Sequence, residues 1–132
     1  MQITKQADYA VRAMAYLAKI EKNQRAATSD IAEAQKIPPS FLAKIISQLS
    51  IAGLIFTSRG AHGGVMLSRP AGDISMLDVV EAIDGPISLN DCTLAPQSCE
   101  RSDDCPMHDI WSDLQKELVE KLRASTFDKF VR

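Results

Sequence analysis

The sequence predicts a mainly α-helical protein with one small β-hairpin: a winged helix-turn-helix followed by a long C-terminal helix. Three observations predict this fold class. Apolar residues recur at spacings of three and four in several segments, which is typical of amphipathic helices. Two short helical segments are separated by the pair Pro38-Pro39, and a glycine-rich loop joins two short β-type runs after them. A tight helix pair followed by such a hairpin is the winged form of the helix-turn-helix.

The first two helices are expected in residues 4–35. Thr4 can cap a first helix that runs to about Lys22. A second, short helix should follow Thr28, Ser29 and Asp30, whose side-chain oxygens can cap it, and Glu33 lies three residues after Asp30 as in a capping box. The apolar stripe of the first helix consists of Ala7, Ala10, Val11, Met14, Leu17 and Ala18.

The third helix and the hairpin follow the proline pair. Prolines interrupt the helical pattern, and a proline also suits the first turn of the next helix. That helix is expected from about Ser40 to Ala52, with Gly53 as its stop. Residues 54–58 are expected to form a strand, residues 59–64 a loop, and residues 65–68 the returning strand.

The second half of the chain contains two further helices and the cysteines. Ser75, with Asp78 three residues later, should cap a fourth helix that ends at Gly85-Pro86. Pro106 should open a long last helix, whose apolar stripe is Ile110, Trp111, Leu114, Leu118 and Leu122. We therefore expect a winged helix-turn-helix domain (1–85), a cysteine loop (86–106), and a C-terminal helix and tail (107–132) that forms a single compact unit with the first segment.

Length and composition limit the class of protein. With 132 residues, the chain is long enough for one compact domain. No apolar run approaches the roughly 20 residues that cross a membrane. The polar residues 1–9 lack the apolar core of a signal peptide. We expect a cytoplasmic protein without a membrane partner.

The charge is divided unevenly along the chain. Residues 1–70 have nine Lys and Arg against four Asp and Glu, a balance of +5, and residues 71–132 have six against thirteen, a balance of −7; together they give the net charge of −2. A basic half suits contact with a polyanion. In a winged helix-turn-helix the second helix of the pair enters the major groove and the wing lies along the backbone or minor groove. We expect DNA contacts from Thr28, Ser29, Pro39, Ser40, Phe41, Lys44, Ser58, Arg59 and His62.

The sequence resembles the IscR/NsrR family of winged-helix repressors over nearly its whole length. The resemblance includes Asp8-Tyr9-Ala10, Leu17-Ala18, Ile31-Ala32, Ser40-Phe41-Leu42, Gly53-Leu54, Arg59-Gly60-Ala61-His62-Gly63-Gly64 and the three cysteines before a long helix. The resemblance implies a homodimer held by the long C-terminal helix. It also implies that Ser40, Lys44, Ser58 and Arg59 recognise the operator. For a twofold dimer, that operator is expected to be pseudo-palindromic. The chain departs from the commoner pattern at Val65, where a tyrosine is usual, and in a six-residue gap between Cys92 and Cys99.

Cys92, Cys99 and Cys105 lie within fourteen residues, with His108 shortly after them. An odd number of clustered thiols favours a metal or redox centre over a disulfide framework. By spacing alone, structural zinc, an iron–sulfur cluster and a thiol switch all stay open. The resemblance favours a cluster, 2Fe–2S or 4Fe–4S. Three thiolates need a fourth ligand: Asp8 of the partner subunit, which the resemblance implies, is favoured slightly over His108, and Asp103 and Asp104 are weaker candidates.

The predicted function is that of a dimeric DNA-binding regulator, a repressor, whose cluster senses nitric oxide, redox state or iron supply. The alternative is a winged-helix regulator with structural zinc or a thiol switch and no cluster. An iron–sulfur electron carrier or enzyme is disfavoured, because no nucleotide loop or catalytic triad is found, and we expect no enzymatic activity. A protein-interaction module is disfavoured by the basic N-terminal half.

Overall fold

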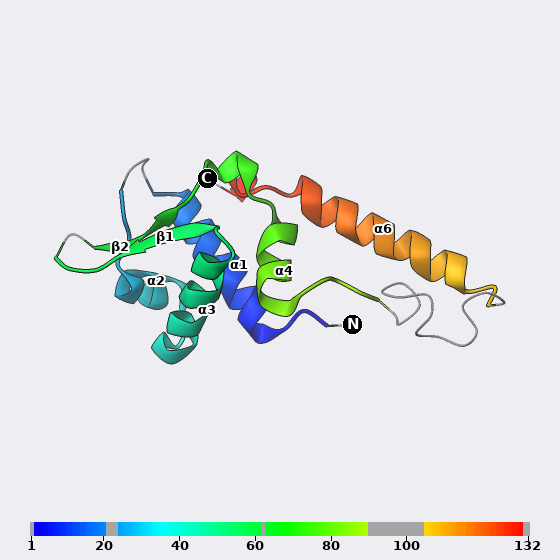
Figure 1. Ribbon diagram of the computed structural model, residues 1–132, viewed down its shortest axis with the longest axis horizontal. Coiled ribbons are helices and arrows are strands. Elements are labelled where there is room, and N and C mark those ends of the chain that lie inside the picture. Colours follow the sequence, from blue (N-terminus) through cyan, green and yellow to red (C-terminus); the bar gives the residue numbers. More distant parts are fainter. Residues whose placement is uncertain (1, 21–23, 62, 90–104, 131–132) are drawn as a thin grey trace.

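The computed structural model describes residues 2–20, 24–61, 63–89 and 105–130. Figure 1 shows one body that contains the first four helices, a hairpin that projects from one end, and a long helix that extends from the other. This arrangement confirms the predicted fold class. The elements in chain order are α1 (Lys5–Ala18), α2 (Thr28–Gln35), α3 (Pro39–Ile51), β1 (Ile55–Ser58), β2 (Gly64–Leu67), η1 (Ala71–Asp73), α4 (Met76–Asp84), α6 (His108–Ala124) and η3 (Phe127–Phe130).

The hairpin is anchored to the helix pair by one residue. β1 and β2 are antiparallel, with Ile55 opposite Leu67 and Ser58 opposite Gly64. On the other side of β2, Ala26 and Val65 exchange two backbone hydrogen bonds of 2.9 and 2.8 Å. Since Ala26 lies just before α2, this bridge fixes the hairpin relative to the start of the helix pair.

Gly64 is required for that bridge. A Cβ atom at this position would lie 2.6 Å from the carbonyl oxygen of Ala26, and the φ angle of +143° is one that other residues rarely adopt. A Cβ at Gly63 would lie 2.4 Å from the carbonyl oxygen of Ser58. Gly64 therefore allows β2 to approach Ala26, and Gly63 allows the loop to close against the end of β1.

The core lies around α1, which contacts α2, α3, α4 and β2. The first residue of η3 also enters it: Phe127 is fully buried, and its N–H donates to the carbonyl oxygen of Ile74 at 3.1 Å. The segment after α6 is therefore packed into the core around α1. The largest fully buried side chains are Phe127, Met14, Ile31, Leu42, Ile45, Leu49, Ile55 and Ile74.

The predicted helix ends are confirmed in part. The Thr4 hydroxyl accepts from the N–H of Ala7 at 3.1 Å, and Ser75 and Asp78 form the capping box expected for α4. Gly53 follows α3 with a φ of +77° and ends it as predicted. α1, however, ends at Ala18 rather than near Lys22.

Two other expected helix starts are wrong. The capping box predicted for α2 is absent, because the bridge between Ala26 and Val65 places the helix start at Thr28 and leaves Asp30 inside the first turn. α6 begins at His108, two residues after Pro106.

Candidate nucleic-acid interface and cysteine segment

α2 and α3 form a helix-turn-helix with a turn of residues 36–38. Lys36 adopts the left-handed conformation (φ 54°, ψ 48°), which ends α2, and Ile37 is buried beneath the turn. Pro39 occupies the first turn of α3, where a missing N–H costs nothing. Leu42, one turn later, donates its N–H to the carbonyl oxygen of Pro38 at 3.0 Å. The buried apolar turn therefore holds the two helices at a fixed angle.

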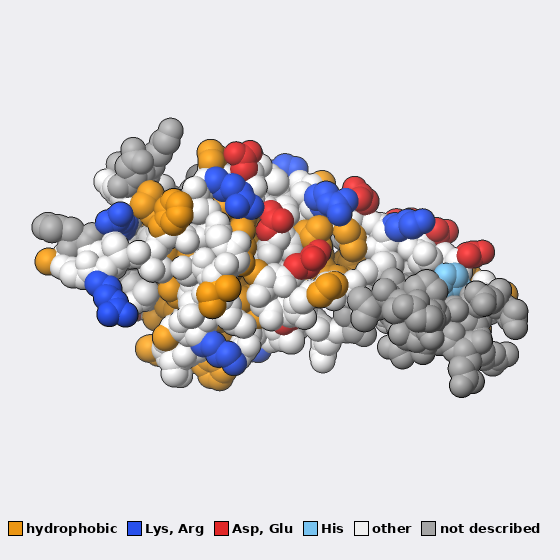
Figure 2. Space-filling model, in the orientation of Figure 1, with side chains coloured by type: hydrophobic (Ala, Val, Ile, Leu, Met, Phe, Trp, Pro, Cys, Tyr) orange, Lys and Arg blue, Asp and Glu red, His pale blue; other side chains and the backbone are white. Residues whose placement is uncertain are grey.

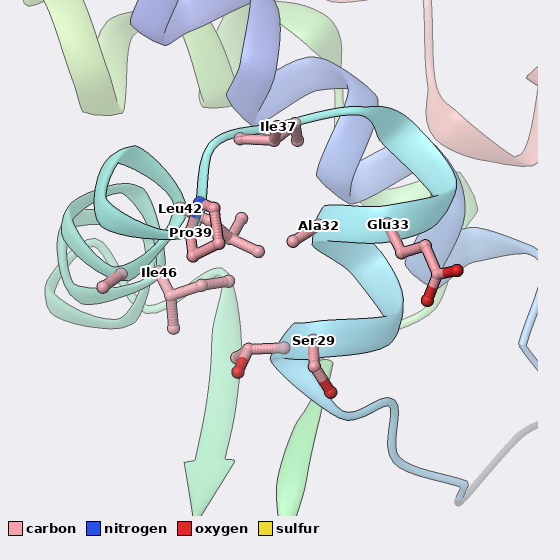
Figure 3. Close-up of a pocket in the computed structure, with 9 residues that line it drawn as sticks. Ser29, Ala32, Glu33, Ile37, Pro39, Leu42 and Ile46 are labelled. Atoms are coloured by element: carbon pink, nitrogen blue, oxygen red, sulfur yellow. The ribbon is translucent and has the colours of Figure 1, made fainter.

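A groove of about 620 Å³ runs between α2 and α3. In Figure 3, Ala32 of α2 faces Pro39 and Leu42 of α3, whereas Glu33 points away from them. The floor is thus apolar, and the hydroxyl of Ser29 lies at its edge. Polar side chains that can meet DNA are arranged around this apolar contact. The residues of α2 and α3 that are predicted to bind DNA are all exposed: Thr28, Ser29, Pro39, Ser40, Phe41 and Lys44.

The charges on the surface are unevenly distributed. In Figure 2, the end of the molecule that holds the hairpin and α3 shows Lys and Arg side chains, whereas over α4 and α6 the Lys and Arg side chains are interspersed with Asp and Glu. This difference follows the sequence, since residues 1–70 have a balance of +5 and residues 71–132 a balance of −7. The helix-turn-helix and its wing therefore present the more positive surface.

Phe41 lies against α1. Its ring centroid is 6.2 Å from that of Tyr9, with the planes tilted by 56°, and 45% of Phe41 is exposed. Cationic groups of Lys5 and Arg12 lie 5.2 and 5.5 Å from the centroid of the same Tyr9 ring. Sequence reasoning did not assign Tyr9 a role at this site, because the contact joins helices far apart in the chain and leaves no local pattern.

The wing places two predicted contacts next to α3. Arg59 is exposed, and Ser58 is half-buried at the end of β1. The Oγ of Ser58 is buried and finds no hydrogen-bond partner in the part of the chain that the structure describes. His62, predicted at the tip, lies outside the described residues.

The cysteine segment is described only at its C-terminal end. Cys92, Cys99, Asp103 and Asp104 lie outside the described residues. Cys105 has a free thiol and is half-buried. Its backbone carbonyl oxygen accepts a hydrogen bond from the N–H of His108 at 3.1 Å. These two potential ligands therefore lie at the two ends of the turn that leads into α6.

His108 also has an unused nitrogen. Its Nδ1 is buried and lacks a hydrogen-bond partner among the described residues. A buried ring nitrogen without a partner is costly unless another group satisfies it. Among residues 2–20, 24–61, 63–89 and 105–130, no three potential metal ligands lie together.

Asp8 is engaged elsewhere in the chain. Its carboxylate forms an ion pair with Arg12 at 2.7 Å, one helical turn later on α1. Figure 1 places the first turn of α1 well away from the first turn of α6. Asp8 and His108 are thus not brought together within the chain.

The first half of α6 exposes an apolar face. Ile110 is 59% exposed, Trp111 and Leu114 are exposed on the same half of the helix, and Met107 is exposed at its N-cap. The second half packs through Leu118, Val119 and Leu122 on Leu77, Val80 and Ile87. Among the described residues, the helix therefore has one apolar half that is covered by α4 and Ile87 and one that is exposed.

The fold and this surface define a winged helix-turn-helix transcriptional regulator. Residues 3–132 match the Rrf2 family, which is described as iron-dependent transcriptional regulators. The chain belongs to the Rrf2 family. The expectation that it is not an enzyme is confirmed, because this is a family of transcriptional regulators.

Relatives and solved structures agree with the family. The HTH-type transcriptional regulator IscR of Xenorhabdus nematophila is 31% identical over 132 residues, which are 100% of this chain and 80% of the relative. The structure of T. potens IscR superposes with a TM-score of 0.78 at 25% identity, covering 98% of this chain and 85% of that one. CymR, the global cysteine regulator of B. subtilis, superposes with a TM-score of 0.82 at 24% identity, covering 98% and 96%, and shows the fold alone. None of the described helices is both long and apolar enough to span a bilayer.

Proposed function

We propose that this chain is a cytoplasmic, homodimeric repressor that binds a pseudo-palindromic operator, and that an iron–sulfur cluster on Cys92, Cys99 and Cys105 controls its binding. The observation that carries the proposal is the helix-turn-helix with its wing, whose polar and cationic side chains are exposed on the more positive end of the molecule. A dimer of such units meets half-sites roughly 34–36 Å apart, so the spacing of the two α3 helices governs affinity.

The proposed DNA contacts come from three places. Thr28 and Ser29 offer hydroxyls from the start of α2, where backbone N–H groups also favour a phosphate. Pro39, Ser40, Phe41 and Lys44 occupy the first turns of α3, the part of a recognition helix that meets base edges. The wing contributes Ser58, Arg59 and His62.

The dimer is proposed on the apolar half of α6. Ile110, Trp111 and Leu114 would otherwise leave large apolar surfaces in water, where each is costly. The chain divides, in this proposal, into the DNA-binding domain (1–85), the cluster-binding loop (86–106) and the dimerisation helix and tail (107–132). The burial of Phe127 supports the packing of the tail with the first domain as one compact unit.

The described part of the cysteine segment fits a metal centre. Cys105 offers a thiol just before α6, and His108, its first residue, offers a buried ring nitrogen that has no partner among the described residues. This fit supports His108 as the fourth ligand. Asp8 of the partner subunit stays the other candidate: its ion pair with Arg12 is half-exposed, and such pairs contribute about 0–1 kcal/mol, so ligation could displace it.

A cluster or a zinc ion would hold the loop to the start of α6 through these side chains. When bound, an iron–sulfur cluster supplies a centre that responds to oxidants, nitric oxide or iron supply. Cys105 precedes α6 by three residues and His108 is its first residue, so a group bound to both would also orient the exposed apolar half of that helix. Structural zinc on the same donors, or a thiol switch, is the second candidate.

The test combines a spectrum with a binding assay. Protein purified without oxygen is expected to absorb in the visible and to contain iron and acid-labile sulfide; colourless protein with stoichiometric zinc would leave only the DNA-binding proposal. Duplexes are then selected from a random pool, and Cys99→Ala is compared with the wild type on them. A Cys99→Ala variant with unchanged affinity would contradict control by a cluster.

A further inference from the structure

A glutamine of α6 holds the segment that follows α4. The side-chain amide of Gln115 makes two hydrogen bonds to the backbone of this segment. Its Nε2 donates to the carbonyl oxygen of Ile87, and its Oε1 accepts from the N–H of Leu89 at 2.8 Å. An amide side chain has both a donor and an acceptor, so one residue can satisfy both backbone groups. Gln115 therefore attaches residues 87–89 to α6.

The same segment is fixed at its beginning. Asp84, the last residue of α4, accepts a hydrogen bond of 2.6 Å from the hydroxyl of Thr4, which caps α1. Ile87 is buried in the apolar cluster that joins α4 to α6. Figure 1 shows the segment leaving α4 in the direction of the first half of α6. The position of Leu89 relative to α6 is therefore defined, and Gln115 makes the last contact that defines it.

Gln115 lies on the same face of α6 as His108. Seven residues are about two helical turns, so the two side chains project from one face, about 10 Å apart along the axis. Both residues are half-buried, and so is Ser112 between them. The face that holds Leu89 is therefore also the face with the buried Nδ1 of His108.

Chain length links this contact to the cysteines. Cys92 comes three residues after Leu89, and Cys105 comes three residues before α6. Because three residues span at most about 11 Å, Cys92 lies within that distance of Leu89 whatever path the backbone takes. Holding Leu89 on Gln115 therefore keeps Cys92 close to the first half of α6, which begins at His108.

We propose that Gln115 is a positioning residue for the metal centre, because it holds Leu89, and with it Cys92, beside the first half of α6. Gln115 is not itself a ligand and acts through the backbone of residues 87–89. A ligand that is held in place before the metal binds loses less conformational freedom on binding, so the affinity rises. This inference rests on the proposed function, in which Cys92 and Cys105 share one centre.

The first test measures the affinity for Zn²⁺ alone. Reduced, metal-free full-length protein is titrated with Zn²⁺ in competition with a chromophoric chelator. Gln115→Met keeps an unbranched side chain that suits a helix but removes both hydrogen bonds. It should bind Zn²⁺ about tenfold more weakly, as is common when a group that orients a metal ligand is removed. Gln35→Met makes the same change on α2 and should keep the wild-type affinity.

The second test separates positioning from a structural role alone. Amide hydrogen exchange of the Leu89 N–H is measured by NMR in the metal-free and the Zn²⁺-loaded wild type. If the hydrogen bonds of Gln115 favour Zn²⁺ binding, Zn²⁺ must favour these hydrogen bonds by the same factor, since coupling is reciprocal. Zn²⁺ should therefore slow this exchange about tenfold. A Gln115 that only stabilised the fold would lower the urea midpoint of Gln115→Met and change neither measurement.

The outcomes distinguish this inference from the proposed function. Equal Zn²⁺ affinities of wild type and Gln115→Met, an equal loss in Gln35→Met, or Leu89 exchange that Zn²⁺ leaves unchanged would each overturn the role of Gln115 and leave the metal centre in place. A wild type that binds neither Zn²⁺ nor iron would overturn the proposed metal centre itself.

Discussion

The ring of Tyr9 on α1 packs against the ring of Phe41 on α3, with 6.2 Å between their centroids. Phe41 lies between Ser40, a proposed DNA contact, and the buried Leu42, so this contact ties the exposed start of α3 to α1. Tyr9 is next to Asp8, which pairs with Arg12, and Arg12 also lies over the Tyr9 ring. The position of the recognition helix therefore depends on a small cluster at the beginning of the chain.

The contribution of this contact to stability can be measured by a double-mutant cycle. Phe41→Ala, Tyr9→Ala and the double variant are unfolded in urea at one protein concentration. We expect a coupling free energy of about 0.5–1.5 kcal/mol, the range for tilted aromatic pairs. Additive losses would show that the two rings do not stabilise each other.

Gly64 should tolerate alanine less well than Gly53. Gly64→Ala places a Cβ 2.6 Å from the Ala26 carbonyl oxygen and should cost about 2–4 kcal/mol through displacement of the bridge. Gly53→Ala meets open space and should cost about 1–2 kcal/mol, from its positive φ alone. Equal losses in thermal or urea unfolding would contradict the role assigned to the bridge with Ala26.

Ser75 caps α4, and its hydroxyl accepts from the N–H of Asp78 at 3.1 Å. Ser75→Ala should lower the free energy of unfolding by about 0.5–2 kcal/mol. Thr28→Ala is the matched control, because α2 has no side-chain cap and the change should stay within about 0.5 kcal/mol. The capping account fails if the two variants unfold at the same urea concentration.

The apolar half of α6 is expected to hold the dimer. Ile110→Asp places an unpaired carboxylate in that interface and should raise the dimer dissociation constant at least about 100-fold, or roughly 3 kcal/mol. Light scattering after gel filtration measures the mass, and Asp113→Ala on the same helix serves as the control. An Ile110→Asp protein that stays dimeric would move the interface elsewhere.

The fourth ligand can be assigned by comparing two variants. If His108 ligates the cluster, His108→Ala should lose its visible absorption in air faster than wild type, because one ligand of the centre is missing. Asp8→Ala should then behave as wild type in the same assay. The opposite result would assign the ligand to Asp8 of the partner subunit.

The sequence alone predicted the fold class, the hairpin and the capping box of Ser75 and Asp78, because periodicity, turns and caps are local patterns. The family resemblance also came from residues that can be read in order, above all the string of residues 59–64 and the cysteines. Three things required the tertiary structure. The bridge between Ala26 and Val65 decided where α2 starts, the contact between Tyr9 and Phe41 joined two distant helices, and the hydrogen bonds of Gln115 attached the segment after α4 to α6. Each of these depends on contacts between residues far apart in the chain, and such contacts leave no spacing for a sequence pattern to show.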